Sequence, residues 1–132
     1  MDEKLIGTIK EVLQKDRRVI FAYLHGSILK TNTTNDIDIA IYSRKNVSPY
    51  VLSADLKVAL YNRTGIAADT FDIHVINDIL DTGDLFALIF LKNVFSENVL
   101  LVDRVYSLRT DFLERYGMKF RECEGLISEI VS

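Results

Sequence analysis

Tryptophan is absent from this chain of 132 residues, and cysteine and proline occur once each. The single cysteine, Cys123, cannot form a disulfide within the chain, and it excludes a zinc site built from several cysteines. Long apolar runs are also missing, because the most apolar stretch, Leu85 to Leu91, is far shorter than the roughly 20 residues that cross a bilayer. The N-terminus is acidic and amphipathic, unlike a signal peptide. We therefore expect a soluble, cytoplasmic protein without membrane contact.

A strong charge of either sign is missing as well, since the formal net charge is −3. This mild acidic balance gives no general electrostatic reason to bind nucleic acid, and we expect no direct nucleic-acid partner. Apolar residues make up 48% of the chain and charged residues 27%, which is typical of globular proteins and not of disordered ones. The length suits one compact domain.

Hydrophobic periodicity predicts helices and strands in alternation. We expect helices near 5–18, 49–63, 84–95 and 103–117, strands over 19–24, 36–42 and 71–76, one helical turn after residue 27, and a short extended piece over 99–102. Ser48 is expected to cap the second helix, with Gly65 as its stop signal, and Asp81 or Thr82 to cap the third. Gly117 is expected to end the last helix. This order predicts an α/β fold (α+β, two-layer), with helices packed on a small mixed sheet.

Several aspartates are predicted to lie on strands of this sheet near the Gly26-Ser27 turn. Asp36 and Asp38 alternate along a strand, so both side chains point to one side, where they can share a hard cation such as Mg²⁺. Asp72 begins a similar strand and can complete a site for two ions about 3.5–4 Å apart. Gly26 has no side chain that would keep a phosphate away from the backbone, and Ser27 offers an N–H and a hydroxyl to phosphate oxygens. The pattern predicts a phosphoryl-transfer site.

Each motif also has a plainer interpretation. Alone, the Asp-x-Asp pair is equally typical of a solvated strand edge or of a turn that begins at Asn35, and Gly-Ser after an apolar run is common in ordinary turns. The combination with Asp72 favours the metal site. His25 and His74 are interpreted as structural or supporting groups, because phosphoryl transfer through two metals needs no histidine base.

Gly26-Ser27, followed by Asp36-Ile37-Asp38, resembles the signature of the DNA polymerase β-like nucleotidyltransferase superfamily. The later runs FDIHVIN (71–77) and FSENVLLVDR (95–104) are similar to the minimal nucleotidyltransferase (MNT) antitoxins, which are encoded with HEPN-domain ribonuclease toxins. The resemblance implies the nucleotidyltransferase fold and an antitoxin that transfers AMP from Mg-ATP to a tyrosine of a partner HEPN toxin, in a hetero-oligomer.

The resemblance also assigns roles to individual residues. It implies that Asp36, Asp38 and Asp72 are the catalytic, metal-binding residues and that Gly26 and Ser27 bind the nucleotide. The loop after Gly-Ser lacks the Arg-Gly pair that is frequent in the family, so Lys30 is expected to supply the positive charge there. Residues 1–117 are expected to form the nucleotidyltransferase domain, and 118–132 a C-terminal segment that docks a partner.

Two alternatives stay open. Only eight residues, 28–35, separate Gly-Ser from Asp-x-Asp, fewer than is usual in the family. With the apolar C-terminal segment, this motivates a non-catalytic antitoxin that neutralises its toxin by complex formation only. The second alternative is a nucleotidyltransferase that acts on a small molecule or an RNA end, although the chain has no obvious second domain to hold such a substrate.

Overall fold

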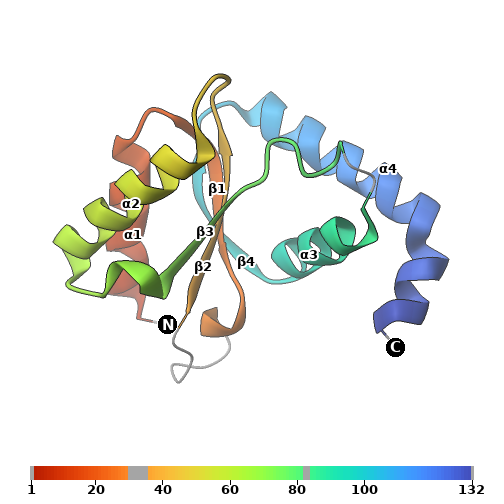
Figure 1. Ribbon diagram of the computed structural model, residues 1–132, viewed down its shortest axis with the longest axis horizontal. Coiled ribbons are helices and arrows are strands. Elements are labelled where there is room, and N and C mark those ends of the chain that lie inside the picture. Colours follow the sequence, from red (N-terminus) through yellow and green to blue (C-terminus); the bar gives the residue numbers. More distant parts are fainter. Residues whose placement is uncertain (1, 30–35, 82–83, 132) are drawn as a thin grey trace.

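The computed structural model describes residues 2–29, 36–81 and 84–131 (Figure 1). Its elements follow in the order α1 (Glu3–Lys15), β1 (Val19–His25), the 3-10 turn η1 (Ser27–Leu29), β2 (Ile37–Ser43), α2 (Pro49–Thr64), the 3-10 turn η2 (Ala68–Thr70), β3 (Phe71–Val75), α3 (Leu85–Ser96), β4 (Asn98–Asp103) and α4 (Tyr106–Val131). None of the helices in these ranges is both long and apolar enough to span a membrane.

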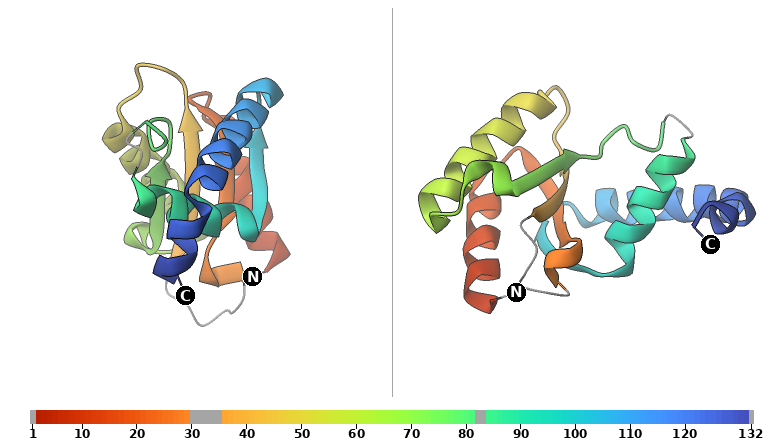
Figure 2. Two further views of the ribbon diagram at one scale, coloured as in Figure 1. Left: turned by 90° about the vertical axis from the view of Figure 1, so that its right-hand side faces the viewer. Right: turned by 60° about the horizontal axis from the view of Figure 1, so that its bottom comes forward.

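The strands form one mixed sheet in the order β3-β2-β1-β4. β1 is antiparallel to both of its neighbours, whereas β2 and β3 run parallel. Helices α1 and α2 lie on one side of the sheet, and α3 and α4 lie on the other (Figures 1 and 2). The predicted α+β fold with a small mixed sheet is confirmed. Helices cover both faces of the sheet, so the arrangement has three layers and not the two that were expected.

The sheet separates two apolar cores. Strand β1 is buried along its whole length, as its unbroken apolar run predicts. Ala22 and Leu24 belong to the core beneath α1 and α2, and Phe21 and Tyr23 to the core beneath α3 and α4. On the second face, the ring of Phe21 stacks on that of Tyr42 with centroids 4.9 Å apart. A central strand buried on both sides holds the ends of its neighbours in place.

Helix α2 forms the crossover between the parallel strands β2 and β3, and its ends follow the sequence signals. The Ser48 hydroxyl accepts a hydrogen bond from the Val51 N–H at 3.4 Å, and Pro49 occupies the first helical position. Gly65 ends the helix in the left-handed conformation, with φ of 74°. Both of these predictions are confirmed.

Helix α3 lies where it was predicted, but its N-cap differs from the predicted one. Asp84 is its N-cap, and the Asp84 carboxylate accepts a hydrogen bond from the Phe86 N–H at 2.8 Å. The prediction of Asp81 as the cap was wrong, because that carboxylate pairs instead with Arg115 of α4 at 3.1 Å. Thr82 lies outside the described residues.

The C-terminal third of the chain differs most from the prediction. Helix α4 does not end at Gly117 but continues to Val131, over 26 residues. Tyr116 and Phe120 pack against the apolar core on either side of the glycine, and Ile127 is 1% exposed. Their burial outweighs the cost of about 1 kcal/mol that a glycine imposes on a helix interior. The predicted extended piece at 99–102 is a full strand, β4, paired with β1.

The position of Gly117 within a continuous helix can be tested by stability. Gly117→Ala should raise the free energy of unfolding by about 0.5–1 kcal/mol, because alanine loses less backbone entropy than glycine in a helix. A Cβ there would meet only the Arg121 Nη1 atom at 3.5 Å, an ordinary contact. Urea denaturation followed by circular dichroism measures the change.

Gly65→Ala serves as the matched control. That glycine has a positive φ and terminates α2, so its replacement should lower the free energy of unfolding by about 1 kcal/mol. A loss of similar size for Gly117→Ala would mean that residue 117 ends a helix, contrary to the structure.

Candidate functional site

Three strands bring polar side chains to one end of the sheet. Strand β1 ends there, while β2 and β3 begin there, because β2 is antiparallel to β1 and parallel to β3. In the register of the sheet, Asp38 of β2 lies between His25 of β1 and Asp72 of β3. Paired residues on neighbouring strands point to the same face. The three side chains therefore share the face that carries α3 and α4.

Gly26 follows β1 directly and lies against the first of these carboxylates. Its φ of 90° is one that residues with side chains rarely adopt. A Cβ at this position would also collide with the Asp38 Oδ2 atom. Glycine is required twice over, for the turn and for the close approach of the backbone to Asp38. The Gly-Ser and Asp-x-Asp motifs, separated in sequence, thus form one site.

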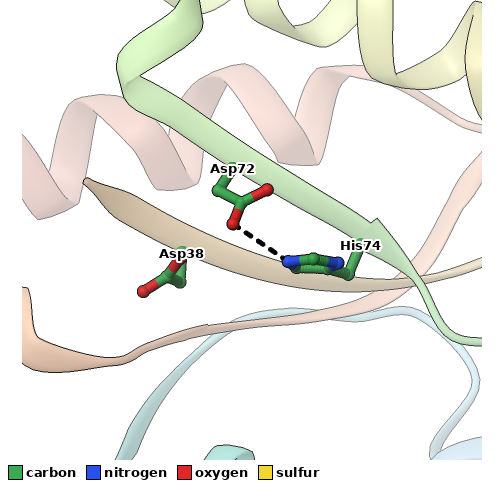
Figure 3. Close-up of side chains that lie close together, drawn as sticks. All are labelled: Asp38, Asp72 and His74. Carbon is green, nitrogen blue, oxygen red and sulfur yellow. Dashed lines mark ion pairs between the residues drawn. The ribbon is translucent and has the colours of Figure 1, made fainter. Parts of the chain in front are cut away.

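Asp38, Asp72 and His74 form a compact cluster (Figure 3). Each offers one ligand atom, and these atoms all lie within 4.8 Å of one another. The His74 Nε2 atom is 3.1 Å from Asp72 Oδ2, and the two side chains are 42% and 54% exposed. Asp36 is exposed just before β2 and does not belong to this cluster of ligand atoms. The cluster is open to solvent and can admit a ligand.

The charges at this site are poorly balanced. Burial of the Asp38 carboxyl raises its pKa, and the negative charge of Asp72, with a smaller effect from Asp36, raises it further. The electrostatic effect of His74 opposes this rise without cancelling it. A bound cation would stabilise the ionised form of Asp38.

His25 lies beside Asp38 and is buried, with 5% of its surface exposed. Burial, assisted by the nearby His74, lowers the pKa of His25 to about 4, so its ring is neutral at pH 7. Among the described residues, none forms a hydrogen bond with its Nε2 atom. Phe90 of α3 contacts both histidine rings, with centroids 5.6 Å from His25 and 5.0 Å from His74.

These residues fit a divalent metal. Two carboxylates and an imidazole converge on one point, their charge is not neutralised, and oxygen and nitrogen ligands of this kind bind divalent ions in proteins. The backbone at Gly26 approaches the Asp38 carboxylate closely, with no side chain between them. The arrangement suits a metal that carries an anionic ligand such as a phosphate.

The structure brings together some of the predicted site residues. Gly26, Asp38 and Asp72 lie side by side, and Ser27 begins η1 directly after the glycine. Lys30 lies outside the described residues. Sequence reasoning did not include His74 in the site, although its place two residues after Asp72 put both side chains on one face of the strand.

The sequence profile of the polymerase beta nucleotidyltransferase family matches residues 7–106. The chain belongs to the polymerase beta nucleotidyltransferase family. The matched range of this nucleotidyltransferase contains all four strands and every residue of the cluster. No protein of curated function matches it significantly by sequence.

Solved structures give the same fold. A chain of the structure described as the tri-AMPylated Shewanella oneidensis HEPN toxin in complex with MNT antitoxin matches this nucleotidyltransferase with a TM-score of 0.59 at 15% identity, over 100% of both chains. A toxin–antitoxin structure with AMP-PNP gives 0.59 at 14% identity, again over 100% of both. The structure of the toxin–antitoxin MntA-HepT gives 0.58 at 15% identity, over 99% of this chain and 100% of the other.

The contact between Gly26 and Asp38 predicts a dependence between two substitutions. Gly26→Ala should cost about 2 kcal/mol or more of folding stability, from the positive φ and from the collision with the carboxylate. In an Asp38→Ala background the collision with the carboxylate is lost, while the backbone strain and a contact of 3.3 Å with the Cβ of residue 38 stay, so the same change should cost about 1 kcal/mol. A double-mutant cycle in urea denaturation measures the difference. Equal costs in both backgrounds would show that the glycine and the aspartate are not in contact.

Proposed function

We propose that this nucleotidyltransferase is an antitoxin that transfers AMP from ATP to a tyrosine of a partner HEPN toxin in the cytoplasm. One observation carries the proposal: the Gly26 turn lies against Asp38, beside Asp72, at the end of a sheet that belongs to a nucleotidyltransferase family. The partner and the transferred group are supported by the structure of similar fold that contains a tri-AMPylated HEPN toxin with an MNT antitoxin.

We assign the nucleotide to the turn that follows β1. Gly26 presents backbone without a side chain beside Asp38, and Ser27 offers its N–H at the start of η1. Lys30 is proposed to add positive charge near the phosphates. The turn would hold the triphosphate so that its α-phosphorus faces the acidic cluster.

Asp38 and Asp72 are proposed to hold the divalent ions, with Asp36 as a further ligand from the start of β2. Two ions, with Mg²⁺ accompanying ATP, would neutralise the phosphates and lower the pKa of the attacking hydroxyl. The tyrosine oxygen forms a bond to the α-phosphorus while the bond to pyrophosphate breaks. We propose that Asp72, which is 54% exposed, accepts the hydroxyl proton.

We propose that residues 118–132 dock the toxin. Figure 1 shows the last turns of α4 on the side of α3 that faces away from the sheet. Large apolar side chains in this segment are about half exposed: Met118, Leu126, Ile130 and Val131. An exposed apolar surface of this kind is typical of a binding site for another protein.

The same surface favours a second candidate function, a non-catalytic antitoxin. Apolar contacts by α4 need no nucleotide, so binding alone could neutralise the toxin. The two functions differ in one respect: AMP transfer requires the aspartates, whereas complex formation does not.

Incubation of the purified chain with the HEPN protein encoded beside it, Mg²⁺ and ATP labelled on the α-phosphate tests the proposal. Label should move to a toxin tyrosine, identified by mass spectrometry. Asp72→Asn should lower the rate at least a hundredfold, because the metal ligand and the proton acceptor are lost together. Asp69→Asn, just before β3 and outside the cluster, is the matched control and should retain the rate.

Size-exclusion chromatography of the same pair without ATP separates the two functions. A stable complex, no label transfer, and toxin neutralisation that survives Asp72→Asn would overturn the catalytic proposal in favour of binding alone. Neutralisation lost with Asp72→Asn while the complex persists would support catalysis.

A further inference from the structure

His74 places a nitrogen atom in a site where the family resemblance led us to expect carboxylates only. Its Nε2 atom belongs to the cluster of ligand atoms with Asp38 and Asp72, which come from two adjacent parallel strands. We infer that His74 is a direct metal ligand and that the ion held by Asp38, Asp72 and His74 is a first-row transition metal, such as Mn²⁺, in preference to Mg²⁺. The inference deepens the proposed function and rests on its divalent-metal site.

The spacing of the ligand atoms suits one ion. Two ligands at right angles around an ion, each about 2.1 Å from it, are about 3.0 Å apart. The observed separation of 3.1 Å between His74 Nε2 and Asp72 Oδ2 matches this value. The remaining ligand atom, on Asp38, lies within 4.8 Å of both. An ion between the three atoms would need only small movements of half-exposed side chains.

The imidazole ring is held in position before any ion arrives. Phe90 of α3 packs against it at 5.0 Å, with the ring planes at 62°. The same phenylalanine contacts His25, which lies buried beside Asp38. Figure 3 shows the His74 ring on β3, with its paired nitrogen directed toward Asp72. A ring fixed in this way loses little freedom when it binds a metal.

The choice of metal follows from the ligands. Mg²⁺ prefers oxygen ligands and keeps much of its water, whereas first-row transition metals accept imidazole nitrogen more readily, with an affinity that rises along the row from Mn²⁺. Asp38 and Asp72 alone would not distinguish Mg²⁺ from Mn²⁺ strongly. His74 is therefore the residue that sets the preference, and an ion that accompanies the nucleotide can still be Mg²⁺.

The chain contains only two histidines, which permits a direct spectroscopic test. Electron spin echo envelope modulation of Mn²⁺ bound to the tag-free chain should show coupling to a directly bound imidazole nitrogen. The coupling should vanish in His74→Gln and persist in His25→Phe, which keeps an aromatic ring against Phe90. His74 is 42% exposed, so its replacement should leave the fold intact, as checked by circular dichroism.

Metal titrations give a second readout that separates a ligand from a positioning residue. His74→Gln should weaken Mn²⁺ binding at least about tenfold and Mg²⁺ binding much less. An equal loss for both ions, or Mn²⁺ bound to the wild type without nitrogen coupling, would overturn the inference and leave His74 as the group that orients Asp72.

Asp72→Asn distinguishes this failure from that of the proposed function. If Asp72→Asn abolishes Mn²⁺ binding while His74→Gln does not change it, the inference is wrong and the metal site stands. If the nitrogen coupling is present but no AMP reaches the toxin, the proposed function is wrong and the inference stands.

Discussion

The crowding of Asp38 and Asp72 is the constraint on which the site depends. The two carboxylates face each other across a pair of parallel strands, where their mutual repulsion and the burial of Asp38 raise the pKa of Asp38. Parallel neighbours require a crossover, which α2 supplies between its caps at Ser48 and Gly65. The crossover lets β3 run parallel to β2, and their register sets Asp72 beside Asp38.

The surroundings of the two carboxylates divide into a rigid side and an open side. On the rigid side, the Gly26 backbone lies against Asp38, and the ring of Phe90 contacts the rings of His25 and His74. On the open side, the side chains of Asp72 and His74 are about half exposed. A binding site needs both properties, because fixed ligands lose little entropy and an open side admits substrate.

Local signals in the sequence were sufficient for much of this architecture. Ser48 and Gly65 marked the ends of α2, and the apolar run of β1 marked a central strand. The alternation at Asp38 and at Asp72 placed both carboxylates on strand faces. The parallel register that brings them together depends on tertiary packing and could not be predicted.

The predicted end of the last helix at Gly117 was wrong for the same kind of reason. The burial of Ile127 outweighs the preference of Gly117 to end a helix. The contact between Gly26 and Asp38 depends on a positive φ, which a Gly-Ser pair permits but does not specify.

The proposed function requires that the turn and the acidic cluster together bind a nucleotide through divalent metal. Calorimetric titration with a non-hydrolysable ATP analogue measures this binding without any toxin present. We expect binding in Mg²⁺ or Mn²⁺ that disappears in EDTA and weakens at least about tenfold in Asp38→Asn. Binding of equal strength in EDTA, or binding unchanged in Asp38→Asn, would show that the acidic cluster does not hold the nucleotide through a metal.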